Sequence, residues 1–293
     1  MKIKVEPGKY VVAVSGGVDS MVLLDLLCRQ DDIELIVAHF DHGIRADSGK
    51  DRKLVGSVAK KHKLIFKTAS GHLGNGASEE QARNARYLFL NKVKDSCGTR
   101  AIITAHHQDD LIETAILNLL RGSGRLGLSS MLNSKEILHP LISFSKQDIL
   151  AYAKKAGITW REDSSNVDTK YLRNYVRINI IPKLTDVKKQ ELLNNAERVA
   201  EKMQETESLI ATLSQSISSY GEIDRSKYLV VPSPLDKELI AYWLRREGIR
   251  DFDRKTIERL CLGLKTARAN TRLDIAKGLN LEIGTTVAHF SNR

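Results

Sequence analysis

A short run near the amino terminus carries the residues best suited to chemistry: Ser15-Gly16-Gly17-Val18-Asp19-Ser20. It follows an apolar stretch typical of a buried strand and precedes a pattern typical of a helix. Two glycines allow a tight turn that directs successive backbone N–H groups at a phosphate, and the dipole of the helix favours the anion. Ser15 and Ser20 can add hydroxyl donors, and Asp19 is placed to hold Mg²⁺ near the phosphates. The run therefore predicts a phosphate-binding loop.

Two acids form a second candidate group. Asp110 and Glu113 stand three residues apart on a predicted helix that begins directly after a strand. Both side chains should therefore lie on one face, near the carboxyl edge of the sheet. Such a pair can hold an ammonium group, and one carboxylate can accept a proton from an attacking amine. The alternative is a solvated helix start that attracts acids, and this explanation suffices for Asp109.

Two pairs of arginines complete the candidates. Arg83 and Arg86 lie one turn apart in a predicted helix, where a fixed planar charge can stabilise charge that builds on a transferring phosphate. A salt bridge to a nearby glutamate is the alternative, and it applies more to Arg83 than to Arg86. Arg173 and Arg177 are four residues apart, so they share a helix face that can contact nucleotide or RNA phosphates. A solvated basic face is the alternative for this second pair.

Three further patterns fail on context or ligand spacing. The stretch Gly122-Ser123-Gly124-Arg125-Leu126-Gly127 has the letters of a dinucleotide fingerprint, but it follows a predicted helix instead of a strand. Leu128 stands where a P-loop requires lysine. His106-His107 with Asp109-Asp110 lacks the spacing of a further zinc ligand. We therefore predict no dinucleotide site, no kinase-type or GTPase-type loop and no metal other than Mg²⁺.

The first third of the chain alternates short β-branched apolar runs with amphipathic helical patterns. Predicted strands span residues 10–14, 34–40, 64–68 and 100–105. Predicted helices span residues 20–30, 48–62, 78–95 and 109–121, and the third opens with the capping box Ser78-x-x-Gln81. This alternation is typical of an α/β fold with a parallel sheet and crossover helices.

The rest of the chain divides into three parts. A Gly-rich connection leads to a predicted helix at 146–156, capped by Ser145 and ended by Gly157. Residues 183–220 contain neither Gly nor Pro, which predicts long linking helices, and Gly221 marks the entry to a small terminal domain. We expect an α/β domain at 1–184, a helical linker at 185–221 and a small basic C-terminal domain at 222–293.

Composition is that of an ordinary globular protein, with 42% hydrophobic and 28% charged residues among 293. No apolar run approaches about 18 residues and no signal-peptide core is present, so we expect a cytoplasmic protein without a membrane partner. Cys28, Cys97 and Cys261 are far apart, which predicts reduced thiols. The net charge of +10 favours a polyanionic partner, although a solvated surface fits the charge equally well. Residues 241–293 carry 11 Lys or Arg against 6 Asp or Glu.

The loop at 15–20 resembles that of the N-type ATP pyrophosphatases, the PP-loop superfamily, which split ATP to AMP and pyrophosphate. Further motifs narrow the resemblance to the tRNA(Ile)-lysidine synthase family. They are Ala38-His39-Phe40-Asp41-His42-Gly43-Ile44-Arg45, Glu80-Gln81-Ala82-Arg83-Asn84-Ala85-Arg86-Tyr87, Ala105-His106-His107-Gln108-Asp109-Asp110-Leu111-Ile112-Glu113-Thr114, Arg121-Gly122-Ser123-Gly124, and Glu162-Asp163-Ser164-Ser165-Asn166 with Arg173-Asn174 and Arg177. The resemblance is dense over residues 11–184 and looser beyond, where the length fits the short form of the family.

The resemblance implies an adenine-nucleotide α-hydrolase-like fold and a two-step reaction on a minor tRNA(Ile) with a CAU anticodon. In this family, O2 of the wobble cytidine attacks the α-phosphate of ATP. The ε-amine of free L-lysine then displaces AMP at C2, which gives lysidine. The implied cofactors are ATP and Mg²⁺, and a homodimer is left open.

Residue roles follow from the same resemblance. The implied ATP-binding residues are Ser15, Gly16, Gly17, Val18, Asp19, Ser20, His39 and Arg86, and the Mg²⁺ ligand is Asp19. Lysine binding is implied for Asp110 and Glu113, and tRNA binding for Arg173, Arg177 and His106. The implied catalytic residues are Asp19, Arg86, Asp110, Glu113 and Arg177.

Other kinds of protein fit less well. A related tRNA thiolase would need paired cysteines for an iron–sulfur cluster, and a glutamine-using amide synthetase would need an ammonia source. The sequence provides neither. A binding module without catalysis would be expected to lose its charged positions, yet none of the implied catalytic residues is missing. We therefore expect a ligase that forms a carbon–nitrogen bond.

Overall fold

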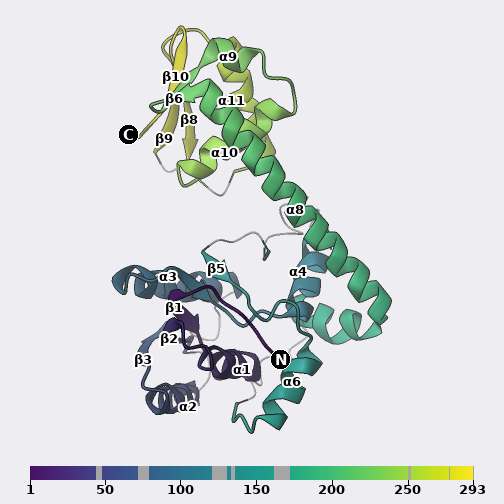
Figure 1. Ribbon diagram of the computed structural model, residues 1–293. Coiled ribbons are helices and arrows are strands. Elements are labelled where there is room, and N and C mark those ends of the chain that lie inside the picture. The colour runs from purple at the N-terminus through teal and green to yellow at the C-terminus, as the bar shows by residue number, and fades with distance from the viewer. Residues whose placement is uncertain are drawn as a thin grey trace. The chain divides into compact units, whose positions relative to one another are not determined.

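The computed structural model describes residues 1–43, 48–71, 79–120, 131–132, 136–161, 172–249, 252–276 and 278–292. They form two compact units, Met1–Ala200 and Glu201–Arg293 (Figure 1). The division falls inside one long helix, α8 (Asp186–Ile217), and the domain limits expected from the sequence remain predictions. Four features named above lie outside the described residues: Ile44-Arg45, Ser78, the Gly-rich stretch at 121–128 and the motif at 162–166.

A five-stranded parallel sheet forms the centre of the first unit. Its strands are β1 (Gly8–Ala13), β2 (Ile33–Asp41), β3 (Ile65–Ser70), β4 (Ala101–Ile103) and β5 (Ile137–Leu138). Their order is β3-β2-β1-β4-β5, and every neighbouring pair is parallel. The chain first moves outward from β1 to β3 and then crosses to β4 on the other side. The carboxyl ends of β1 and β4 therefore form a topological switch point, where ligands bind in sheets of this kind.

Helices cover both faces of this sheet (Figure 1). On one face pack α1 (Val18–Leu27), α2 (Ser48–Lys61) and α6 (Lys146–Lys155). On the other face packs α3 (Glu79–Ser96). The remaining helix near the switch point is α4 (Gln108–Leu120), which begins soon after β4.

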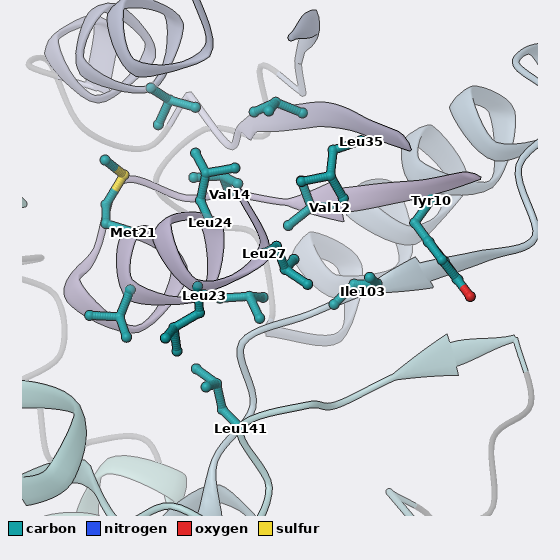
Figure 2. Close-up of a cluster of buried hydrophobic side chains, with 14 of the residues drawn as sticks. Tyr10, Val12, Val14, Met21, Leu23, Leu24, Leu27, Leu35, Ile103 and Leu141 are labelled. Atoms are coloured by element: carbon teal, nitrogen blue, oxygen red, sulfur yellow. The ribbon is translucent and has the colours of Figure 1, made fainter. Parts of the chain in front are cut away.

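Side chains of β1 alternate between two cores. Tyr10 and Val12 belong to the cluster in Figure 2, together with the α1 residues Leu23, Leu24 and Leu27. Val11 belongs to the opposite cluster, together with Leu90 and Val93 of α3. A strand that is buried on both faces needs apolar residues at every buried position, which explains the apolar run from Tyr10 to Ala13.

The elements predicted for the first unit are confirmed, with ends displaced by a few residues. The exception is β5, which has two residues and therefore no periodicity to detect. Ser145 caps α6 as expected: its Oγ accepts a hydrogen bond from the N–H of Asp148, whose carboxylate accepts one from the N–H of Ser145. Gly157 follows α6 in the left-handed conformation, with φ of 64°.

An irregular helical segment leads out of the first unit. It consists of α7 (Leu172–Tyr175), a π-helical turn (Val176–Ile180) and a 3₁₀ turn (Ile181–Lys183). Single π-helical turns often occur at functional sites, and this one carries Arg177. The long α8 follows as one helix of 32 residues.

The second unit combines an antiparallel sheet with short helices. Its strands, β6 (Ser218–Ser219), β7 (Glu222–Asp224), β8 (Thr271–Ala276), β9 (Leu279–Ile283) and β10 (Val287–Asn292), have the order β6-β7-β10-β9-β8. Its helices are α9 (Arg225–Leu229), α10 (Leu235–Arg246) and α11 (Arg254–Thr266). The indole N–H of buried Trp243 donates to Ser214 Oγ at 2.8 Å, which satisfies a polar group inside this core. No described helix in either unit is long and apolar enough to cross a membrane.

The ion pair between Asp51 and Arg161 supports the phosphate loop. The N–H of Arg161 donates to the Gly16 carbonyl oxygen at 3.0 Å, and Arg161 Nε lies 2.6 Å from Asp51 Oδ1. Asp51 is buried against the loop, and a Cβ at position 16 would lie 3.3 Å from the Asp51 Cβ. Gly16 also has a φ of 98°, a conformation that side chains disfavour. The loop therefore depends on both glycine and this ion pair.

We expect Asp51→Asn to lower the free energy of unfolding by about 1–3 kcal/mol, because Arg161 loses its charged partner. The measurement is urea denaturation of the full chain. Asp31→Asn, at an exposed position, is the matched control and should stay within about 0.5 kcal/mol of the wild type. Equal stability of the two variants would contradict a supporting role for the pair.

Candidate active site

The phosphate loop closes around one hydroxyl group. Ser20 Oγ donates to the Gly17 carbonyl oxygen at 2.9 Å and accepts from the N–H groups of Ser15 and Gly16, each at 3.2 Å. Ser20 therefore shapes the loop. The helix α1 begins after Gly17 without a side-chain cap, so its first N–H groups have no side-chain acceptor and suit an anion.

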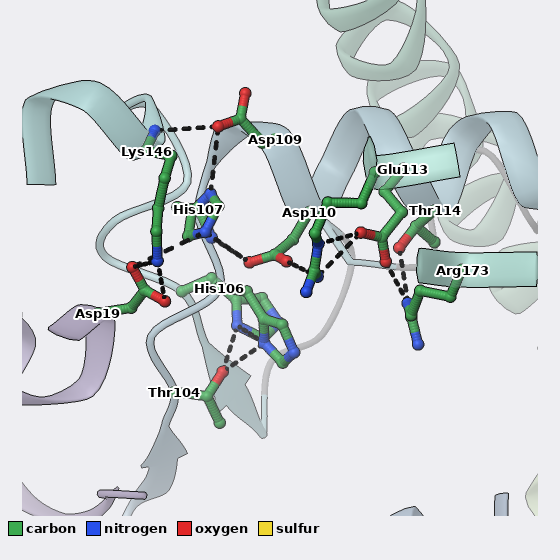
Figure 3. A network of polar contacts seen from close by, with 12 residues as sticks. Asp19, Thr104, His106, His107, Asp109, Asp110, Glu113, Thr114, Lys146 and Arg173 are labelled. Carbon is green, nitrogen blue, oxygen red and sulfur yellow. Dashed lines mark hydrogen bonds and ion pairs between the residues drawn. The ribbon is translucent and has the colours of Figure 1, made fainter. Parts of the chain in front are cut away.

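Asp19 pairs with a cation that the sequence did not single out. Nζ of Lys146 lies 2.6 Å and 2.7 Å from the two carboxylate oxygens of Asp19 (Figure 3). The N–H of Lys146 donates to Asp109 Oδ2 at 3.0 Å, so the start of α6 is attached to both the loop and α4. One signal was available: lysine occupies the first position of a helix, where the dipole disfavours a cation.

Asp19 fits Mg²⁺ as a single ligand. Among the described residues, no group of three or more His, Cys, Asp or Glu side chains could hold a metal ion. Mg²⁺ is commonly held by one or two carboxylates together with substrate phosphates. Asp19 could serve in this way once its oxygens leave Lys146, so the donor set suits a metal that arrives with a nucleotide.

His107 connects the loop to α4. Its Nε2 lies 3.4 Å from Asp110 Oδ2 and 3.9 Å from Asp19 Oδ1, and its Nδ1 lies 3.9 Å from Asp109 Oδ2 (Figure 3). Burial alone would raise the pKa of Asp110, but the pKa is held below its ordinary value. The main causes are the electrostatic interaction with His107, a hydrogen bond from the N–H of His107 and the charge of Arg177. Asp110 therefore stays ionised.

Glu113 lies between two arginines. Its side chain is 1% exposed, Arg177 Nε donates to its Oε2 at 2.9 Å, and Arg173 Nε donates to its Oε1. Arg177 also donates to Asp110 Oδ1 at 3.2 Å. Burial raises the pKa of Glu113, while the charges of Arg177 and Arg173 oppose that rise. The expectation that the two acids share a face, and that the two arginines share another, is confirmed by these contacts.

The structure brings the two acids to arginines, whereas the sequence had suggested phosphates for Arg173 and Arg177. Two negative and two positive side chains here form one cluster, which we call the acid–arginine quartet: Asp110, Glu113, Arg173 and Arg177. The quartet has no net charge. A ligand with an ammonium group can bind to its acids by competing with the arginines.

His39 lies beneath the start of the loop. It is 3% exposed, and its Nδ1 lies 2.8 Å from the carbonyl oxygen of Val14, the residue that precedes the loop. The ring therefore donates from Nδ1, which leaves Nε2 as a buried acceptor without a partner among the described residues. Its predicted contact with ATP stays a prediction.

The arginines of α3 lie on an aromatic ring and near a histidine pair. The guanidinium carbons of Arg83 and Arg86 lie 4.8 Å and 5.4 Å from the centre of the Tyr87 ring. Their charges also act on His106, as the pKa of that ring shows. The structure thus places Arg86 near the loop after β4, and its role at a phosphate stays a prediction.

A hydroxyl joins two histidines beside the quartet. Thr104 Oγ1 lies 2.7 Å from Nδ1 of both His106 and His139, and the two Nδ1 atoms are 3.3 Å apart. Burial is the main cause that lowers the pKa of His106 to about 3, and His139, Arg86 and Arg83 add to it against the opposing charge of Asp110. Burial and Arg83 lower the pKa of His139 to about 4. Both rings are therefore neutral at pH 7.

This shift predicts a pH dependence of stability. In the unfolded chain both rings titrate near pH 6.5, so between about pH 4 and 6.5 the unfolded state binds more protons. Stability should fall as the pH is lowered through this window, by about 1–2 kcal/mol per ring from pH 7 to pH 5. Urea unfolding at both pH values measures the loss, which His139→Asn should reduce and exposed His62→Asn should not. An unchanged loss in His139→Asn would contradict the prediction.

A parallel sheet with a glycine-rich loop after its central strand defines a class of nucleotide-binding protein. Residues 2–184 match the family model of the PP-loop domain. The fold also resembles a solved U34-tRNA thiolase from Methanococcus maripaludis with its [4Fe-4S] cluster, with a TM-score of 0.55 over 67% of this chain and 74% of that chain. Sequence identity to the thiolase is 17%, so the likeness concerns the fold alone. The expected PP-loop fold is confirmed.

Curated relatives narrow the class. The tRNA(Ile)-lysidine synthase of Francisella tularensis subsp. holarctica is 31% identical over 290 residues, which cover 96% of this chain and 73% of the relative. The synthase of Methylococcus capsulatus is 35% identical over 87% of this chain and 62% of its own length. The synthase of Geobacter sulfurreducens is 36% identical over 71% of this chain and 46% of its own length. The chain belongs to the tRNA(Ile)-lysidine synthase family of enzymes.

Proposed function

We propose that this enzyme joins lysine to C2 of the wobble cytidine of a minor tRNA(Ile) with a CAU anticodon, and that ATP activates the cytidine. Family membership supports the general function. One observation about the chain itself carries the proposal: the acid–arginine quartet lies beside the PP-loop, connected to it through the contacts of His107 with Asp110 and Asp19. A site for an amine thus adjoins a site for a nucleotide.

The first step takes place at the PP-loop. Backbone N–H groups at the start of α1 hold the phosphates of ATP. O2 of the cytidine forms a bond to the α-phosphorus, and the bond to the β-phosphate oxygen breaks, so pyrophosphate leaves. Mg²⁺, when bound by Asp19 and the phosphates, would supply positive charge to the leaving group. Arg86 stabilises the charge that builds on the α-phosphate.

The second step uses the quartet. A neutral lysine amine bonds to C2 of the adenylated cytidine, the C2–O bond breaks, and AMP leaves. Asp110 has a lowered pKa and stays ionised. This charge suits Asp110 to hold the α-ammonium of lysine while the neutral ε-amine reacts. The pKa of Glu113 is raised by burial, which makes Glu113 the better proton acceptor. We therefore assign the general base to Glu113.

The tRNA makes several contacts in this proposal. Arg173, Arg177 and His106 contact the anticodon region, and the basic C-terminal part binds phosphates farther along the tRNA. Phosphate contacts of this kind release counterions, so affinity for tRNA should fall steeply with salt. The reaction requires tRNA, ATP and free lysine in one compartment, and we place it in the cytoplasm.

The direct assay combines the enzyme with ATP, Mg²⁺, labelled lysine and unmodified tRNA(Ile) carrying the CAU anticodon. We expect label in the wobble nucleoside and one AMP released for each lysine incorporated, as measured by nucleoside analysis. A tRNA with a different anticodon is the control and should take up no label. Release of AMP only with another amine or with a sulfur donor would keep the fold and overturn the proposed substrate.

Glu113→Gln should separate the two steps. It removes the proposed base but keeps a polar side chain between the arginines, so adenylation of the tRNA should continue. Transfer of lysine should fall about 100-fold to 10,000-fold. Single-turnover measurements of pyrophosphate release and of lysidine formation test this, with exposed Glu191→Gln as the control. An equal loss in both steps would show that Glu113 acts through structure alone.

A further inference from the structure

The hydrogen bonds among Thr104, His106 and His139 allow the protons to be counted. Thr104 directly follows β4, and its hydroxyl has one proton to donate. It is 6% exposed and lies 2.7 Å from both Nδ1 atoms, which are themselves 3.3 Å apart. The two rings meet edge to face, with their planes at 84°. Figure 3 shows Thr104 and His106 in the same region as Asp110 and Glu113 of the quartet.

While both rings are neutral, only one kind of proton distribution makes both hydrogen bonds to Thr104 without setting two donors against each other. Two protonated Nδ1 atoms would place two donors against each other at 3.3 Å. Two bare Nδ1 atoms would leave one of them without a donor, because Thr104 can supply a single proton. With one of each, the Nδ1–H of one ring donates to Thr104, and the Thr104 hydroxyl donates to the bare Nδ1 of the other. The two histidines therefore hold opposite tautomers.

The surroundings keep the pair neutral. The charged groups that act on the rings are Arg83 and Arg86 of α3 and Asp110 of α4. The arginines disfavour an imidazolium, and burial does so more strongly. Within the described ranges, neither Nε2 atom has a hydrogen-bond partner. Because the contacts with Thr104 use Nδ1 of each ring, Nε2 is the nitrogen of His106 that is left to contact a ligand.

We propose that Thr104 and His139 are positioning residues: they hold His106 as a neutral ring in one fixed tautomer, so that its Nε2 presents one defined hydrogen-bonding group to the edge of the substrate base. A base edge is recognised by its pattern of donors and acceptors. A ring free to change tautomer or to gain a proton could bind either kind of group. The locked ring selects one. The identity of the base rests on the proposed function. The proton arrangement rests only on the contacts among Thr104, His106 and His139.

The proton arrangement is tested on the full chain without substrate. Nitrogen-15 NMR of histidine-labelled protein at pH 7 should show Nδ1–H for one of the two rings and Nε2–H for the other, with assignments from His106→Asn and His139→Asn. Thr104→Ser should preserve this pattern, because serine keeps the hydroxyl. Thr104→Val leaves only the direct 3.3 Å contact between the two Nδ1 atoms, so it should weaken the pattern. Two rings with the same tautomer in the wild type would overturn the lock.

The effect on the substrate is tested by kinetics. His139→Phe keeps a ring of similar size but removes Nδ1, so the KM for tRNA should rise about tenfold while the KM for ATP changes little. Thr104→Val should behave in the same way, and Thr104→Ser should recover most of the loss. An unchanged KM for tRNA in His139→Phe would overturn the positioning role. If the two rings hold opposite tautomers but the enzyme forms no lysidine, the proton arrangement stands and only the proposed reaction is contradicted.

Discussion

Neutralisation of acids at the switch point is the constraint on which the rest of the first unit depends. Buried or half-buried carboxylates that pair with a lysine or an arginine surround the phosphate loop and the start of α4: those of Asp19, Asp51, Asp110 and Glu113. A buried carboxylate without a cation is strongly destabilising. Each of these acids comes from the first part of the chain, and each cation comes from residues 146–177.

The chain separations show that the site combines residues from distant parts of the sequence. The pairs that join Asp19 to Lys146, Asp51 to Arg161, Glu113 to Arg173 and Glu113 to Arg177 span 127, 110, 60 and 64 residues. The sheet and its loop therefore acquire their charge partners only when the segment after β5 packs against them. In the proposed reaction, lysine competes with arginines at the quartet, and a nucleotide with its metal competes with Lys146 at Asp19.

Patterns among neighbouring residues were enough to predict the fold. The site was predicted less well, because it depends on contacts between residues that are far apart in the sequence. Apolar runs and caps gave the strands of the sheet and the start of α6, because these signals depend on neighbouring residues. Arg173 and Arg177 were expected at phosphates, since nothing in their spacing indicates the acids of a helix 60 or more residues away. His139 was missed for the same reason. The architecture of the second unit was not predicted from the sequence.

The most direct test of the proposed reaction is to ask which substrate receives AMP. The enzyme would be incubated with tRNA and ATP labelled at the α-phosphorus, first without lysine and then with it. We predict that label is found on the tRNA while lysine is absent, and that added lysine releases it as AMP. Label that appears on lysine, or that never reaches the tRNA, would contradict activation of the base.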